Sequence, residues 1–176
     1  MTRYAALLRG VNVGPNTKVA MADLRDLLAG LGYADVRTHL NSGNAVFTGP
    51  DEPGARIAAA IEERLTARLG REIPVVVRTA AELAATVEAN PLEMRDPARL
   101  AVAFLADMPD PDRLRAIDPE EFAPEEVGLG ERELYLYFPN GLGRSKLPMI
   151  LEKRLGVPAT LRNWNTVTKL LALAET

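Results

Sequence analysis

Four short polar motifs hold the residues of this chain that are best suited to bind a ligand. Two lie near the N-terminus, Arg9-Gly10-Val11-Asn12-Val13-Gly14 and Asn41-Ser42-Gly43-Asn44. Two lie near the C-terminus, Gly141-Leu142-Gly143-Arg144-Ser145-Lys146 and Arg162-Asn163-Trp164-Asn165. Glycine lets backbone N–H groups approach a ligand, asparagine both donates and accepts, and arginine can hold a carboxylate or phosphate bidentately. The motifs therefore predict a site for a small anionic or nucleotide-like ligand.

The candidate ligand-binding residues are the glycine, polar and basic members of these motifs. They are Arg9, Gly10, Asn12, Ser42, Gly43, Asn44, Arg144, Ser145, Lys146, Arg162, Asn163 and Asn165. Residues 1–50 hold five basic and three acidic residues, and residues 139–170 hold six and one, whereas residues 51–138 hold ten and nineteen. The motifs therefore lie in the two basic segments, which favours an anion. A structural alternative stays open, because the same residue types form hairpin turns and helix caps.

Composition excludes several kinds of chemistry. The chain has no cysteine and one histidine, His39, so disulfides, thiolate zinc sites and multi-histidine metal sites are impossible. The four motifs contain no acidic residue, which argues against a carboxylate metal site or a pair of catalytic carboxylates there. We expect no metal and no cofactor. The two serines, Ser42 and Ser145, leave a serine-dependent enzyme open as an alternative, although neither has a base at a known motif spacing.

Apolar periodicity predicts the same order of elements twice. In the first half it indicates strands at 3–9, 34–40, 45–47 and 74–78 and helices at 20–31 and 54–69. In the second half it indicates strands at 100–105, 126–129, 134–138 and 158–162, helices at 111–117 and 147–155, and a last helix capped by Asn163 or Asn165. Residues 80–89 form a connecting helix in this interpretation.

The predicted fold class is α+β, with two tandem ferredoxin-like (β-α-β-β-α-β) plaits and a C-terminal helix. The predicted domains are residues 1–78 and 100–176, joined by a helix and linker over 79–99. This topology gathers the first two motifs at one end of the first plait and the last two at one end of the second. If the two pairs form one site, they must line a cleft between the halves. Its walls would carry Arg9, Asn12, Ser42 and Asn44 on one side and Arg144, Lys146, Arg162 and Asn165 on the other. The alternative, two separate polar ends, stays open.

A second hypothesis is single-stranded nucleic-acid binding through an open sheet face that carries Tyr135 and Tyr137. The low aromatic content, 5%, and the net charge of −3 argue against it. No apolar stretch approaches the roughly 20 residues that span a bilayer, and the N-terminus is a poor signal peptide, so we expect a cytoplasmic protein without a membrane partner. The sequence leaves the oligomeric state open.

Three stretches of the chain carry a family resemblance. They are Leu7 to Gly14, Ser42-Gly43-Asn44-Ala45-Val46-Phe47, and the tail Leu155 to Leu170 with its Arg162-Asn163-Trp164-Asn165 core. Together with Asn90-Pro91 and Gly143-Arg144-Ser145-Lys146, they resemble the bacterial family called domain of unknown function 1697. The resemblance covers essentially the whole chain. It implies a cytoplasmic bacterial protein with a tandem ferredoxin-like fold, and it implies no reaction.

Overall fold

The computed structural model describes residues 1–176, which divide into two compact units. Unit 1 consists of Met1–Ala84 together with Lys169–Thr176, and unit 2 consists of Ala85–Thr168. The two boundaries fall inside the helices α3 (Ala80–Glu88) and α6 (Trp164–Glu175). This division differs from the sequence-based one mainly at residues 169–176, which group with the first unit. No helix is both long enough and apolar enough to cross a membrane.

Unit 1 contains a four-stranded sheet in the order β2-β3-β1-β4, in which every neighbouring pair is antiparallel. Its elements in chain order are β1 (Thr2–Leu8), α1 (Met21–Gly30), β2 (Ala34–Thr38), β3 (Asn44–Gly49), α2 (Gly54–Leu69) and β4 (Val75–Thr79). All six were predicted to within two residues of their ends. The alternation of apolar side chains explains this success, because it is a local property of the chain.

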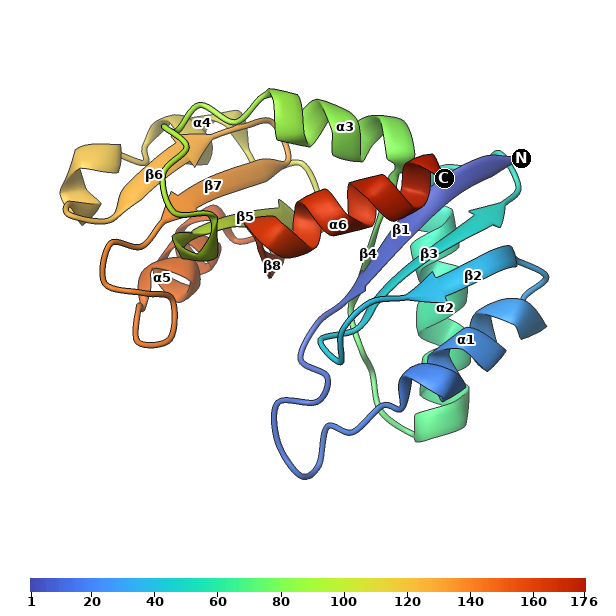
Figure 1. The fold of residues 1–176 in the computed structure, drawn as a ribbon. Coiled ribbons are helices and arrows are strands. Elements are labelled where there is room, and N and C mark those ends of the chain that lie inside the picture. Colours follow the sequence, from blue (N-terminus) through green and yellow to red (C-terminus); the bar gives the residue numbers. More distant parts are fainter. The chain divides into compact units, whose positions relative to one another are not determined.

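The core of unit 1 lies between one face of this sheet and the helices α1 and α2. Tyr4, Phe47 and Leu24 contribute to it, and all three are almost fully buried. Figure 1 shows both helices on the same side of the sheet. The Phe47 ring stacks on Tyr33 with a centroid separation of 4.7 Å and on Tyr4 at 5.7 Å. Gly70 ends α2 in the left-handed conformation that favours glycine, with a φ of 73°.

The C-terminal end of α6 is attached to unit 1 by Arg3. The Arg3 guanidinium donates to the carbonyl oxygens of Leu173, at 3.1 Å, and Ala174, at 3.5 Å. It also donates to Thr48 Oγ1 at 3.1 Å. The last carbonyl groups of a helix lack partners within the helix and carry a partial negative charge, so a cation is favourable there. This interaction explains why residues 169–176 belong to unit 1.

Replacing Arg3 with alanine should lower the free energy of unfolding by about 1–2 kcal/mol, because several charge-assisted hydrogen bonds disappear together while water partly replaces them. Urea unfolding measures this loss. Hydrogen exchange should also become faster in the last turn of α6. Arg56→Ala, at an exposed position of α2, is the matched control and should change neither quantity. Equal effects of the two substitutions would contradict the anchoring role of Arg3.

Unit 2 contains a second four-stranded antiparallel sheet, in the order β6-β7-β5-β8. Its elements in chain order, after α3, are a 3-10 turn (Pro97–Arg99), β5 (Leu100–Leu105), α4 (Pro111–Arg115), a 3-10 turn η2 (Pro119–Phe122), β6 (Glu126–Leu129), β7 (Glu133–Tyr137), α5 (Leu147–Leu155), β8 (Ala159–Asn163) and α6. The core side chains Leu134, Leu136 and Phe138 pack with Leu147 and Leu151 of α5. Apolar periodicity did not predict the two 3-10 turns.

The structure therefore has a mixed α+β fold with two four-stranded antiparallel sheets and six α-helices. In each unit the first strand lies between the third and the fourth, and the second strand lies at an edge. The fourth strand leads directly into a helix, α3 in one case and α6 in the other. The repeated order predicted from the sequence is present in both halves.

Candidate functional site

The first two motifs meet at one end of unit 1, as the topology predicted. Asn12 joins them: its side-chain Nδ2 donates to the Asn41 carbonyl at 2.5 Å and to the Val19 carbonyl at 2.9 Å. Asn12 Oδ1 accepts from the Val19 backbone N–H, also at 2.9 Å. Asn12 has a φ of 56°, a left-handed conformation that asparagine tolerates. Its amide thus holds the β1–α1 loop closed and ties it to the β2–β3 turn.

The β2–β3 turn packs closely against the end of β1. Gly43 has a φ of 89°, and a Cβ added there would lie 2.8 Å from both Leu8 Cβ and Val11 Cγ2. The Leu8 backbone N–H donates to the Gly43 carbonyl at 2.8 Å. Asn44 is fully buried, and its Nδ2 donates to the His39 carbonyl and to Ser42 Oγ, each at 2.8 Å. Gly43 and Asn44 therefore build the turn, which leaves little of either residue exposed to a ligand.

Three basic side chains lie at this end of unit 1. Arg9 is half-buried and Lys18 is exposed. Arg71, from the loop before β4, donates to the Lys18 carbonyl at 3.4 Å, so a third cation lies against the same loop. Gly10 is exposed with a φ of 71° and has open space where a Cβ would lie. The accessible groups of this end therefore include basic side chains as well as the exposed Asn41 and Ser42.

The last two motifs also meet at one end of the sheet, in unit 2. The last residue of β7, Tyr137, lies opposite Leu100, and the last residue of β8, Asn163, lies opposite Ala101. Both strands therefore finish beside the start of β5. Asn163 Nδ2 donates to the Ala98 carbonyl at 2.9 Å, and its Oδ1 accepts from the Asn165 backbone N–H at 2.9 Å. Asn163 thus caps α6, one of the two alternatives predicted.

Ser145 plays a comparable structural role at the start of α5. Its Oγ accepts from the Leu147 backbone N–H at 3.1 Å and so provides an acceptor for one of the N–H groups that have no partner within the helix. Arg144 and Lys146 on either side of Ser145 are exposed, as is Asn165. The loop therefore presents two cations next to the N-terminus of a helix, where the helix dipole also favours negative charge.

The cation of the fourth motif differs, because the Arg162 side chain is buried. It lies on β8 opposite Val102, and its Nη1 donates to the Leu161 carbonyl at 3.0 Å. Burial removes water from the guanidinium and lowers its pKa to about 10. Unit 1 has an equivalent that was not among the predicted site residues: Arg78 on β4 is buried and donates to the Val77 carbonyl at 3.2 Å. The sequence feature that links the two residues is an arginine one position before the end of the fourth strand of each unit.

The comparisons with known proteins agree with the repeated fold. A sequence profile described as "Protein of unknown function (DUF1697)" matches residues 1–135. The chain belongs to the DUF1697 family. A solved structure, "The structure of conserved bacterial protein SP0830 from Streptococcus pneumoniae", is similar to it, with a TM-score of 0.76 and 27% identical residues over 100% of this chain and 99% of that one. No curated protein matches the chain. The resemblance noted in the sequence is thereby confirmed.

Tyr135 and Tyr137, the two tyrosines of the nucleic-acid hypothesis, are both buried in this DUF1697 chain. Tyr135 is buried and donates its hydroxyl proton to the Thr86 carbonyl at 2.6 Å. Burial, with a smaller effect of the Glu133 charge, raises the pKa of Tyr135 to about 12. The Arg95 guanidinium covers the Tyr137 ring, 3.8 Å from its centroid. These contacts disfavour stacking of nucleic-acid bases on Tyr135 and Tyr137.

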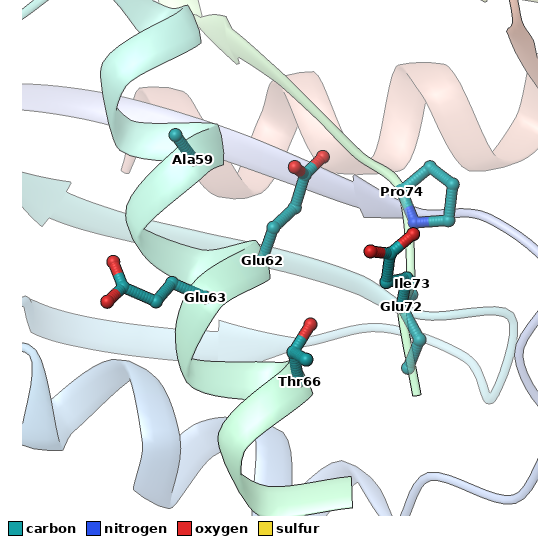
Figure 2. A pocket seen from close by; sticks show the side chains of 7 residues that line it. All are labelled: Ala59, Glu62, Glu63, Thr66, Glu72, Ile73 and Pro74. Carbon is teal, nitrogen blue, oxygen red and sulfur yellow. The ribbon is translucent and has the colours of Figure 1, made fainter. Parts of the chain in front are cut away.

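Two pockets of the DUF1697 chain are lined by acidic side chains and by no basic ones. One, in unit 1, has a volume of about 360 Å³ between α2 and the segment before β4. Figure 2 shows its lining residues: Ala59, Glu62, Glu63, Thr66, Glu72, Ile73 and Pro74. Three carboxylates make it unfavourable for an anion, and Glu62 already accepts from the Val75 backbone N–H at 2.8 Å. No group of three or more His, Asp or Glu side chains is arranged to hold a metal ion.

Proposed function

We propose that this DUF1697 protein binds a small anionic or nucleotide-like ligand through the basic loops at the ends of its two units, and that each unit is a ferredoxin-like plait. The proposal includes a cytoplasmic location. It is supported above all by the loop before α5, where Arg144 and Lys146 are exposed and residues 134–151 contain no acidic side chain. Two positive charges and a helix N-terminus together favour an anion.

In this proposal the members of each motif have different roles. Asn12, Asn44, Ser145 and Asn163 use their side chains to hold the loops and caps in place. The cations Arg144 and Lys146 bind the ligand in unit 2, and Arg9 makes the corresponding contact in unit 1. Preorganised loops lower the entropic cost of binding, so a rigid turn carrying a flexible cation suits a small ligand.

Titrations with inorganic phosphate, adenosine monophosphate and citrate test the proposal, with NMR chemical shifts of the loop amides as the readout. At least one of these anions should shift residues 141–147. Arg144→Ala should then raise the dissociation constant about tenfold or more, because it removes a charge-assisted contact.

Lys169→Ala, at an exposed position of α6, is the control and should leave the dissociation constant unchanged. If none of the three anions shifts these amides at low ionic strength, or if the two variants weaken binding equally, the loop is not an anion site.

A further inference from the structure

Helix α5 has a second apolar stripe, which faces solvent. Leu147, Leu151 and Leu155 form its buried side. On the outer side, Met149 is 68% exposed and Ile150 is 38% exposed. Residues three, four and seven positions apart share one side of a helix, so Lys146 and Lys153 flank this pair. The result is a narrow apolar stripe with a positive charge at each end.

Unit 2 also carries a pocket of the complementary character. It has a volume of about 300 Å³ beside the edge strand β6. Its apolar lining residues are Leu92, Pro119, Ala123, Pro124 and Val127, and its acidic ones are Glu120, Glu125 and Glu126. Glu126 is paired with Arg95 at 2.7 Å, whereas Glu120 is exposed. The pocket is therefore an apolar hollow with carboxylates around it.

We propose that the outer stripe of α5 docks into this pocket on a second copy of the chain. In this contact Met149 enters the apolar hollow, and Lys153 pairs with Glu120 of the partner subunit. Both the charge and the polarity of the two surfaces are complementary, and a flexible methionine adapts to irregular apolar pockets. Within one chain, Arg154 of α5 already pairs with Glu121 of η2, so cations of this helix do meet carboxylates of this turn.

A contact between two different surfaces either is made twice in a symmetric dimer, or closes a larger ring, or extends into longer assemblies. Because the contact joins separate chains, association should depend on the protein concentration. The charged part of the contact is exposed to solvent, so added salt should weaken association. This inference does not depend on anion binding by the loop before α5.

Sedimentation-velocity ultracentrifugation at low ionic strength tests it, over micromolar to millimolar protein concentrations. The weight-average mass should rise above that of the monomer and fall again at high salt. Met149→Ser should weaken association about tenfold or more, because it removes the apolar anchor. Met108→Ser, which changes a 61% exposed methionine of unit 2 outside both surfaces, should leave association unchanged.

Charge exchange separates docking from a folding defect. Lys153→Glu and Glu120→Lys should each weaken association, and the variant that combines both should regain it, because each contact again joins opposite charges. Urea unfolding shows whether the variants are folded. A wild-type chain that stays monomeric at every concentration would overturn the proposal. So would equal effects of the two methionine substitutions, or a combined variant that associates no better than the single ones.

Discussion

Replacing Gly43 with alanine should lower the free energy of unfolding by about 2–5 kcal/mol. A residue with a Cβ pays about 1–2 kcal/mol in the left-handed conformation, and Gly43 has a φ of 89°. The new methyl group would also lie 2.8 Å from Leu8 Cβ and Val11 Cγ2, closer than such atoms approach in proteins. Both neighbours are buried, so relieving this overlap moves core atoms and adds about 1–3 kcal/mol.

Gly10→Ala separates the two causes. Gly10 also has a positive φ, 71°, but an added Cβ there meets no atom within 4 Å. This substitution should therefore show the conformational penalty alone, about 1–2 kcal/mol. Urea unfolding of both variants measures the difference. If Gly43→Ala costs no more than Gly10→Ala, the close packing of the β2–β3 turn against β1 is not as described.

Replacing Asn44 with aspartate should also be strongly destabilising, with a loss of up to about 4 kcal/mol at pH 7. Asn44 is fully buried and donates to the His39 carbonyl and Ser42 Oγ. A carboxylate cannot donate to these oxygens, and burial disfavours its charge. The folded chain would therefore keep the aspartate protonated. Holding a group with an ordinary pKa near 4 in its neutral form at pH 7 costs roughly 1.4 kcal/mol for each pH unit.

The pH dependence tests this explanation. Because folding raises the pKa of the introduced carboxyl, the penalty is absent below the unfolded-state pKa, near 4, and grows as the pH rises from there towards the folded-state pKa. The variant should therefore regain stability relative to the wild type between pH 7 and pH 5, as urea unfolding can measure. Asn16→Asp, at an exposed position of the β1–α1 loop, should change stability little at either pH. A pH-independent loss at Asn44 would contradict a buried, neutral carboxyl.

Gly43→Ala and Asn44→Asp both change the scaffold of the proposed site and leave its cations in place. If the loops bind an anion as proposed, Arg144→Ala should weaken binding in a chain of normal stability. Gly43→Ala and Asn44→Asp should instead lower stability first. The two groups of residues therefore separate the building of the loops from the chemistry they present.

The sequence alone determined the secondary structure and the repeated order of the elements. Strands such as β1 and helices such as α2 follow from apolar residues spaced at two or about 3.6 positions, which is a local property. It also determined that the motifs of each half share an end, because the direction of each strand follows from the order of elements. The absence of cysteine and the single His39 settled which metal and thiol chemistries are impossible.

Only the tertiary structure decided which motif residues are structural. The sequence made Asn12 and Asn44 candidate ligand-binding residues. In the structure their side chains instead donate to the Asn41 and His39 carbonyls, which folding brings close to them. It also placed the last turn of α6 with unit 1, through Arg3, and exposed Met149 on α5. Burial and hydrogen-bond partners depend on which distant segments meet, and local periodicity carries no information on that.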